Sequence, residues 1–172
     1  MIPAQKIILI GPMGAGKTTL GKILARELGW KYFDNDSEMT VRYGHSHSEL
    51  SHMSVQELHA LESQYLADVI SQPAPFISGA AASVVDYEEN RNLLKSVTAI
   101  YLRIPLPLAI ERAGTQGVGR QAVSENGSQI LVERYERRDP LYMDCAALTL
   151  DLASSPEQDA QKIIRFLSDL KN

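Results

Sequence analysis

A glycine-rich segment near the N-terminus carries the strongest chemical signal in the sequence. Residues 11–18 read GPMGAGKT and match the pattern G-x-x-x-x-G-K-[S/T]. Glycines let successive backbone N–H groups turn toward phosphate oxygens, while the lysine brings a positive charge to the terminal phosphates. The threonine hydroxyl suits Mg²⁺, a hard cation that prefers oxygen ligands. The segment therefore predicts binding of ATP with Mg²⁺, through Gly11, Met13, Gly14, Ala15, Gly16, Lys17, Thr18 and Thr19.

Two acidic residues follow soon afterwards with a spacing that favours phosphoryl transfer. Asp34 and Asp36 flank Asn35 directly after an expected strand at 31–33. Alternate residues of an extended segment point the same way, so both carboxylates could face the terminal phosphate. One would hold Mg²⁺ through water and the other would orient an acceptor hydroxyl. The alternative is that Asp36 or Ser37 only caps the helix that follows.

The elements that must position these residues alternate between strand and helix patterns. An apolar run at Lys6–Ile10 indicates a buried strand, and the helix expected after the glycine segment spans Lys17–Leu28. This alternation predicts an α/β fold, with a central parallel sheet covered by helices on both faces. The further strands are expected at Lys31–Phe33, Phe76–Ser78, Thr98–Ile104 and Leu148–Leu152, and the further helices at Leu50–Ser71, Leu106–Ala113, Ile130–Arg138 and Pro156–Leu170.

Size and charge limit the classes of protein that the sequence can encode. With 172 residues, of which 44% are hydrophobic, the chain suits one domain over residues 1–172. A net charge of -4 gives no general attraction to nucleic acid or to anionic membranes. No apolar stretch is long enough to cross a bilayer. We therefore expect a cytoplasmic protein, a monomer, with a small-molecule partner and no nucleic acid or membrane partner.

Two further regions carry residues that could act on a ligand. Residues 114–128 are rich in Gly, Gln, Ser and Asn, which predicts either a lid over bound phosphates or an ordinary surface loop. Arginines gather on the helix expected after it. Of Arg134, Arg137 and Arg138, we expect two on a solvated face and one turned inward.

The segments GPMGAGKTTLGKILARELGWKYFDND at 11–36 and ERRDPLYMDCAAL at 136–148 resemble those of the shikimate kinase family. The resemblance extends over most of the chain. It implies a P-loop kinase three-layer sandwich with a substrate-binding helical region at about 37–70 and a lid at about 114–128. It also implies transfer of phosphate from ATP to a hydroxyl of shikimate, which yields 3-phosphoshikimate and ADP.

Carried over residue by residue, the resemblance implies a role for several side chains. Asp34 would help to hold Mg²⁺ together with Thr18, and Asp36 would contact the acceptor hydroxyl as the candidate base. Arg120 would reach the phosphates from the lid, so that the catalytic residues would be Lys17, Asp36 and Arg120. The substrate carboxylate would bind Arg138, and the adenine would lie between Arg112 and Pro156.

The sequence departs from the family pattern on the acceptor side. Where the family has Phe-Arg-x-x-Glu, this chain has Leu58-His59-Ala60-Leu61-Glu62, so His59 replaces an arginine that binds carboxylate. The family's Gly-Gly-Gly turn corresponds to Gly79-Ala80-Ala81, which adds Cβ atoms near the substrate. The expected acceptor site consists of Asp36, His59, Gly79, Ala80, Ala81 and Arg138.

These departures leave alternatives open. The acceptor could be another polyol or a sugar acid such as gluconate, or the chain could be an ATP-binding module that has lost kinase activity. A nucleoside monophosphate kinase is disfavoured, because it needs several arginines around the acceptor phosphate. Residues 37–70 contain only one arginine, Arg42.

Overall fold

In the part of the chain that the structure describes, five short strands form one sheet, and every neighbouring pair in it is parallel. The structure is a computed structural model that describes residues 1–115 and 127–170. The strand order is β2-β3-β1-β4-β5, which places β1 at the centre of the sheet. The strands are β1 (Lys6–Ile10), β2 (Lys31–Phe33), β3 (Phe76–Gly79), β4 (Thr98–Arg103) and β5 (Leu148–Asp151).

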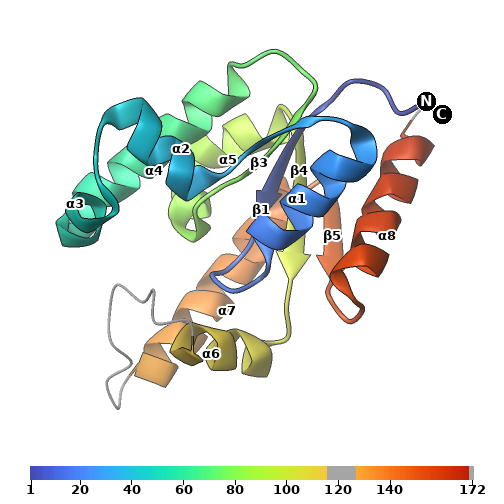
Figure 1. The fold of residues 1–172 in the computed structure, drawn as a ribbon. Helices are drawn as coiled ribbons and strands as arrows, with labels where there is room; N and C mark the ends of the chain where they lie inside the picture. The colour runs from blue at the N-terminus through green and yellow to red at the C-terminus, as the bar shows by residue number, and fades with distance from the viewer. Residues whose placement is uncertain (116–126, 171–172) are drawn as a thin grey trace.

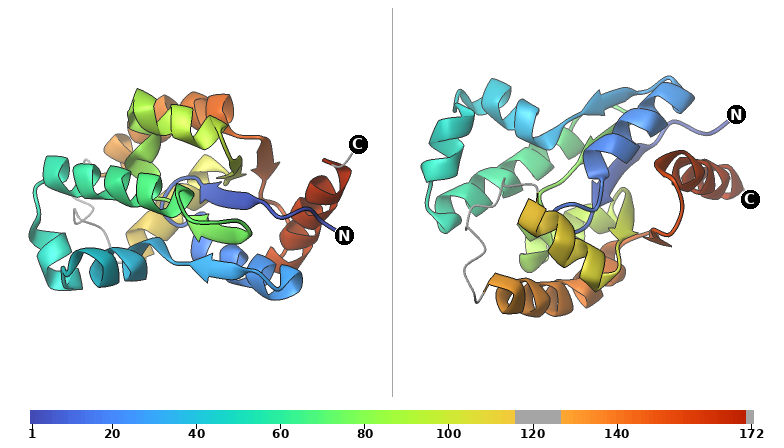
Figure 2. Two further views of the ribbon diagram at one scale, coloured as in Figure 1. Left: turned by 90° about the horizontal axis from the view of Figure 1, so that it is seen from above. Right: turned by 60° about the horizontal axis from the view of Figure 1, so that its bottom comes forward.

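Helices cover both faces of this sheet, so the fold has three layers (Figures 1 and 2). Figure 2 shows α1 and α8 on one side of the sheet, and α5 and α7 on the other. The α-helices are α1 (Lys17–Leu28), α2 (Asn35–Tyr43), α3 (His47–His52), α4 (Val55–Ile70), α5 (Glu88–Lys95), α6 (Leu106–Thr115), α7 (Gly127–Cys145) and α8 (Pro156–Asp169), and a 3₁₀ turn, η1, spans Ala82–Asp86.

The apolar run of β1 explains the two-sided core. Successive strand residues face opposite sides, so Ile8 and Ile10 pack with α4, α5 and α7, whereas Ile7 and Leu9 pack with α1 and α8. All four side chains are fully buried. Burying such a side chain contributes about 1.5–3 kcal/mol, which makes the central strand a rigid base for the loop that follows it.

The predicted strands are confirmed, and two predicted helices differ in extent. The single helix expected at Leu50–Ser71 is two helices, α3 and α4, because Ser46 and Ser54 each begin a helix with a capping box. The helix expected at Ile130–Arg138 is longer and continues through Pro140 as α7. No helix within residues 1–115 and 127–170 has the length and apolar character that a membrane span needs.

Candidate active site

The glycine segment, residues 11–18, forms a loop between the central strand β1 and helix α1, and we call it the phosphate loop. Gly11, at φ 147°, lies so close to the carbonyl oxygen of Leu102 that an added Cβ would be 2.7 Å from it. Gly16, at φ 85°, is the left-handed residue at which α1 begins. These glycines hold the backbone in a curve that side chains would prevent. Within the same loop Met13 is exposed and Ala15 is buried.

Lys17 points into this loop. Its Nζ donates hydrogen bonds to the carbonyl oxygens of Gly11, at 2.7 Å, and Pro12, at 3.0 Å. Burial lowers the pKa of Lys17 to about 8, although the nearby charge of Asp36 acts in the opposite direction. Among the described residues its hydrogen-bond partners are both neutral carbonyl oxygens, so this half-buried ammonium favours an anion beside it.

Arg112 approaches the loop from α6. Its Nη1 donates a hydrogen bond to the carbonyl oxygen of Gly14 at 2.7 Å, and an added Cβ on Gly14 would be 2.9 Å from the Cβ of Arg112. The residue expected beside adenine therefore packs against the phosphate loop. Its expected partner, Pro156, is the first residue of α8 and is exposed.

Asp34 and Thr18 lie together at the first turn of α1. The Thr18 hydroxyl donates a hydrogen bond to Oδ1 of Asp34 at 3.1 Å, and Tyr32 donates to the same oxygen at 3.2 Å. Ser37 donates to Oδ2 through its backbone N–H, at 3.2 Å, and its hydroxyl, at 3.0 Å. Burial by itself would raise the pKa of Asp34, but these hydrogen bonds hold it below its usual value. The carboxylate is therefore ionised at neutral pH.

The expectation that Asp34 and Asp36 share an extended segment is wrong. Asp34 is the N-cap of α2, with φ -83° and ψ 120°, and Asp36 lies in the first turn of that helix. The capping role that the alternative assigned to Asp36 or Ser37 thus belongs to Asp34. Asp36 is exposed, and its charge acts on Lys17. Oδ1 of Asp36 accepts a hydrogen bond from the Asn35 side-chain amide at 3.2 Å, at an exposed position.

Arg138 is held on α7 by an ion pair with Asp86 of η1. Its Nε and Nη2 donate hydrogen bonds to the two carboxylate oxygens of Asp86 at 3.0 and 2.7 Å. The Arg138 side chain is 9% exposed and that of Asp86 is 18% exposed. Burial would raise the pKa of Asp86, but Arg138 and Arg137 lower it below its usual value. Tyr142 also ties α7 to η1 by donating to the carbonyl oxygen of Ala82 at 2.6 Å.

Two residues of α4 border this ion pair. The Nδ1 of His59 lies 2.9 Å from the hydroxyl of Tyr87, and the two rings pack edge to face. Glu62 is buried and accepts a hydrogen bond from the Ser83 hydroxyl at 2.5 Å. The charge of Glu62 acts on both Lys17 and Arg138. The phosphate loop and the acceptor side thus belong to one electrostatic cluster.

The turn at Gly79-Ala80-Ala81 connects β3 with η1. A Cβ added to Gly79 would be 3.9 Å from the Cβ of Lys17, so this glycine lies beside the phosphate loop. Ala80 is buried in the core, and its N–H donates to the carbonyl oxygen of Leu9 at 3.0 Å. Ala81 is half-buried at the start of η1. The extra methyl group of Ala80 therefore packs inward.

The structure brings most of the expected residues to the carboxyl edge of the sheet. Arg120 lies outside the described residues.

Three residues contribute to the site without being expected from the sequence: Tyr32, Asp86 and Tyr87. Tyr32 is two residues before Asp34 and had a local signal. Asp86 and Tyr87 meet Arg138 and His59 across 52 and 28 positions, so that only the fold reveals them.

Loss of the Asp86 carboxylate is expected to destabilise the protein. Asp86→Ala leaves Arg138 buried without its ion-pair partner, which lowers the free energy of unfolding by about 3 kcal/mol. Asp144→Ala is the matched control, because Asp144 pairs with Lys95 at 2.8 Å where both side chains are largely exposed. That control is expected to cost less than about 1 kcal/mol. Urea unfolding measures both, and equal losses would contradict a structural role for the buried pair.

Comparisons with known proteins agree with this geometry. The family model described as shikimate kinase matches residues 13–168. The shikimate kinase of Neisseria gonorrhoeae is 33% identical over 165 residues, which cover 95% of this chain and 96% of the relative. The shikimate kinase of Methylococcus capsulatus is 30% identical over 161 residues, or 93% of this chain and 90% of the relative.

A solved structure extends the likeness to the fold. The shikimate kinase of Acinetobacter baumannii in complex with shikimate superimposes with a TM-score of 0.87 at 28% identity, covering 99% of this chain and 96% of that one. The glycine loop, the sheet order and the match over residues 13–168 lead to one conclusion. The chain belongs to the shikimate kinase family and is an ATP-dependent small-molecule kinase.

Proposed function

We propose that this kinase transfers the γ-phosphoryl group of ATP to a ring hydroxyl of shikimate. The observation that carries the proposal is the electrostatic cluster that joins Lys17 to Arg138. The charge of Glu62 raises the pKa of both residues, whereas the charge of Arg138 lowers the pKa of Lys17. The turn at Gly79 lies beside Lys17 and leads into η1, whose Asp86 holds Arg138. A phosphate site and a carboxylate site linked in this way suit a small acidic acceptor lying between them. The relative from Acinetobacter baumannii was solved with shikimate bound.

The phosphate loop would bind the nucleotide. Lys17 exchanges its two carbonyl hydrogen bonds for contacts with the terminal phosphates, which also restores an anionic partner to the buried ammonium. Backbone N–H groups of Gly14, Gly16 and neighbouring residues would donate to the phosphates at the N-terminus of α1. Arg120 is proposed to reach the transferring phosphoryl group from the lid segment.

Thr18 and Asp34 fit a magnesium ion. They supply a hydroxyl and an ionised carboxylate whose oxygens are 3.1 Å apart, and oxygen is the ligand that Mg²⁺ prefers. Within the described ranges, no group of three or more His, Cys, Asp or Glu side chains could hold a metal. The remaining ligands would therefore be phosphate oxygens and waters. Thr18 and Asp34 would hold the ion where its charge would offset that of the phosphates.

Asp36 is the proposed base for the acceptor hydroxyl. The hydroxyl oxygen attacks the γ-phosphorus, the bond from that phosphorus to the bridging oxygen breaks, and ADP leaves. The hydroxyl proton passes to the Asp36 carboxylate. This carboxylate is exposed at the start of α2, within range of Lys17, so that the acceptor and the phosphate can meet beside it.

A kinase for another polyol or sugar acid is the second candidate. The observation that favours it is His59, which stands where the family has an arginine and which contacts Tyr87. An ADP-release assay over shikimate, quinate, gluconate, common sugars and nucleoside monophosphates separates the candidates. Release with shikimate alone supports the proposal. Release with a different acceptor favours the second candidate, and release with none favours an ATP-binding module.

The pKa of Lys17 predicts how ATP affinity depends on pH. Below about pH 8 the ammonium is charged in the free protein. Above this pH the amine is mostly neutral, so binding of the phosphates must be coupled to uptake of a proton by Lys17. The dissociation constant for Mg-ATP is therefore expected to rise by up to about tenfold per pH unit above 8. Calorimetry with a non-hydrolysable analogue between pH 7 and pH 10 measures it. Lys17→Ala should remove this dependence, and a flat wild-type profile would contradict the lowered pKa.

A further inference from the structure

Arg134 is a half-buried cation whose role the proposed reaction leaves open. It lies on α7, one helical turn before Arg138. Both arginines line a cavity between the phosphate loop, α6 and α7. Within the described part of the chain, the structure gives it no hydrogen-bond acceptor and no ion-pair partner. Burial lowers its pKa, and the charges of Arg138 and Arg137 lower it further. An arginine stays charged in proteins, so this arrangement costs free energy until an anion binds.

Arg138 also has a hydrogen-bond donor that can bind a ligand. Asp86 occupies its Nε and Nη2, and the structure shows no acceptor for Nη1 among the described residues. A guanidinium presents two edges, so one edge is held by Asp86 and the other can bind a second carboxylate. Asp86 therefore positions Arg138, leaving part of its hydrogen-bonding capacity unused.

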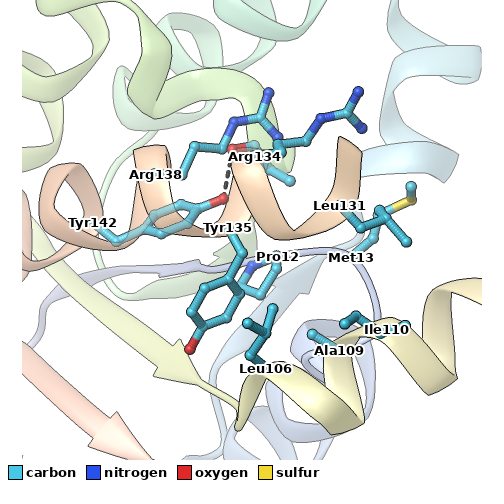
Figure 3. Close-up of a pocket in the computed structure, with 11 residues that line it drawn as sticks. Pro12, Met13, Leu106, Ala109, Ile110, Leu131, Arg134, Tyr135, Arg138 and Tyr142 are labelled. Atoms are coloured by element: carbon cyan, nitrogen blue, oxygen red, sulfur yellow. Dashed lines mark hydrogen bonds between the residues drawn. The ribbon is translucent and has the colours of Figure 1, made fainter. Parts of the chain in front are cut away.

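The expectation of one inward-facing arginine on this helix is therefore wrong. Arg138 is buried and Arg134 is half-buried, whereas the Arg137 side chain is 63% exposed and reaches Asp86 at 3.3 Å. Arg134 and Arg138 are four residues apart, so they lie on the same face of α7. Figure 3 shows both side chains extending to the same side of the cavity, away from Leu106 and Ile110 of α6.

The cavity beside these arginines is suited to a small molecule with an apolar side. It lies between the phosphate loop, α6 and α7 and is partly open to solvent. Pro12 and Met13 of the phosphate loop form one wall, and apolar residues of α6 and α7 form most of the rest. A ligand there would lie next to the phosphate loop, with its anionic group toward the arginines.

We infer that Arg134 and Arg138 form a two-arginine subsite for the carboxylate of the acceptor. Arg134 supplies the second guanidinium, whereas His59 of α4 is engaged with Tyr87. The inference rests on the proposed function and deepens it, because it adds Arg134 as a second carboxylate-binding residue beside Arg138. The titratable groups that face this pair are Arg137, Asp86, Glu62 and His59. The single negative charge of Asp86 acts on Arg134, Arg137 and Arg138, so it can offset only one of their three positive charges.

Arg134→Gln tests the subsite, with Arg137→Gln as the matched control on the same helix. A charged hydrogen bond contributes about 1.5–3 kcal/mol, so Arg134→Gln should raise the KM for shikimate by roughly 10- to 100-fold. The KM for ATP should stay unchanged. Arg137→Gln should change either value by less than about threefold, because exposed ion pairs contribute little. Arg134→Lys should recover only part of the loss, since lysine lacks the planar fork.

Two readouts separate ligand binding from a structural role. The Tm of Arg134→Gln should not fall, because the wild-type side chain has no ion-pair partner within the described residues. The methyl ester of shikimate, which lacks the negative charge, should bind wild type and Arg134→Gln with similar affinity. A rise in the KM for ATP alone would assign Arg134 to a nucleotide phosphate and overturn the inference. Equal effects of Arg134→Gln and Arg137→Gln would also overturn it.

Failure of the proposed function has a different signature. If the wild type releases no ADP with shikimate, calorimetry still tests the subsite. The ligands are shikimate, quinate and gluconate, and each is compared with its neutral ester or amide. Carboxylate-dependent binding that Arg134→Gln weakens would retain the subsite with another acid as acceptor. Tighter binding of the neutral analogues would overturn the subsite itself.

Discussion

Lys17→Ala is expected to lower turnover of ATP and shikimate by about three orders of magnitude, because positioned cations supply most of the stabilisation in phosphoryl transfer. The ammonium lies within the phosphate loop, where it donates to the carbonyl oxygens of Gly11 and Pro12. Its loss removes both an attraction for the ground-state phosphates and a stabilising charge in the transition state. ADP release at saturating shikimate, measured over a wide range of ATP concentration, gives kcat and the KM for ATP separately.

Lys22→Ala is the matched control for this substitution. Lys22 is on the same helix, one turn further on, and is exposed. Its removal changes the net charge by the same amount and should leave kcat within about twofold, as expected for an isolated surface residue. Activity in Lys17→Ala close to that of Lys22→Ala would show that the loop does not bind the reacting phosphates.

Asp36→Asn is expected to lower kcat by about 10²- to 10⁴-fold, the usual contribution of a general base. Binding of ATP should persist, because Asp36 lies at the start of α2 and outside the phosphate loop. Asp36 also raises the pKa of Lys17 against the effect of burial. The fall in ATP affinity with rising pH should therefore begin at a lower pH in Asp36→Asn than in the wild type.

Glu38→Gln provides the comparison for Asp36→Asn. Glu38 lies two residues further along the same helix and pairs with Arg42 at 2.9 Å, away from the phosphate loop. It should retain nearly full turnover. Loss of ATP binding in Asp36→Asn, or turnover equal to that of Glu38→Gln, would remove Asp36 from the proposed chemistry.

The parts of the site that the sequence predicts are those built from neighbouring residues. The loop at 11–18 depends on glycine conformations and on a strand and a helix beside it, all of which leave a local pattern. The place of Asp34 directly after a strand predicts a functional acid. Its second role as a helix cap depends on Ser37, three residues away, so this role also had a local signal.

The parts that the sequence did not predict depend on contacts between distant elements. Asp86 has no pattern that identifies it as the partner of Arg138, because η1 and α7 meet only when the sheet has formed. The inward direction of Arg134 depends on the rotation of α7, which Asp139 fixes by accepting hydrogen bonds from Tyr101 and Arg103 of β4. The number of arginines on the helix was visible in the sequence, but their orientation was not.

Phosphorus NMR of a reaction containing ATP, Mg²⁺ and shikimate identifies the molecule that receives the transferred phosphoryl group. The γ-phosphate signal of ATP is expected to decline while a phosphomonoester signal grows at the same rate, with little inorganic phosphate. Asp36→Asn should slow both changes together. Inorganic phosphate as the main product, or an ATP signal unchanged by shikimate, would contradict the claim that this chain is a kinase for that acceptor.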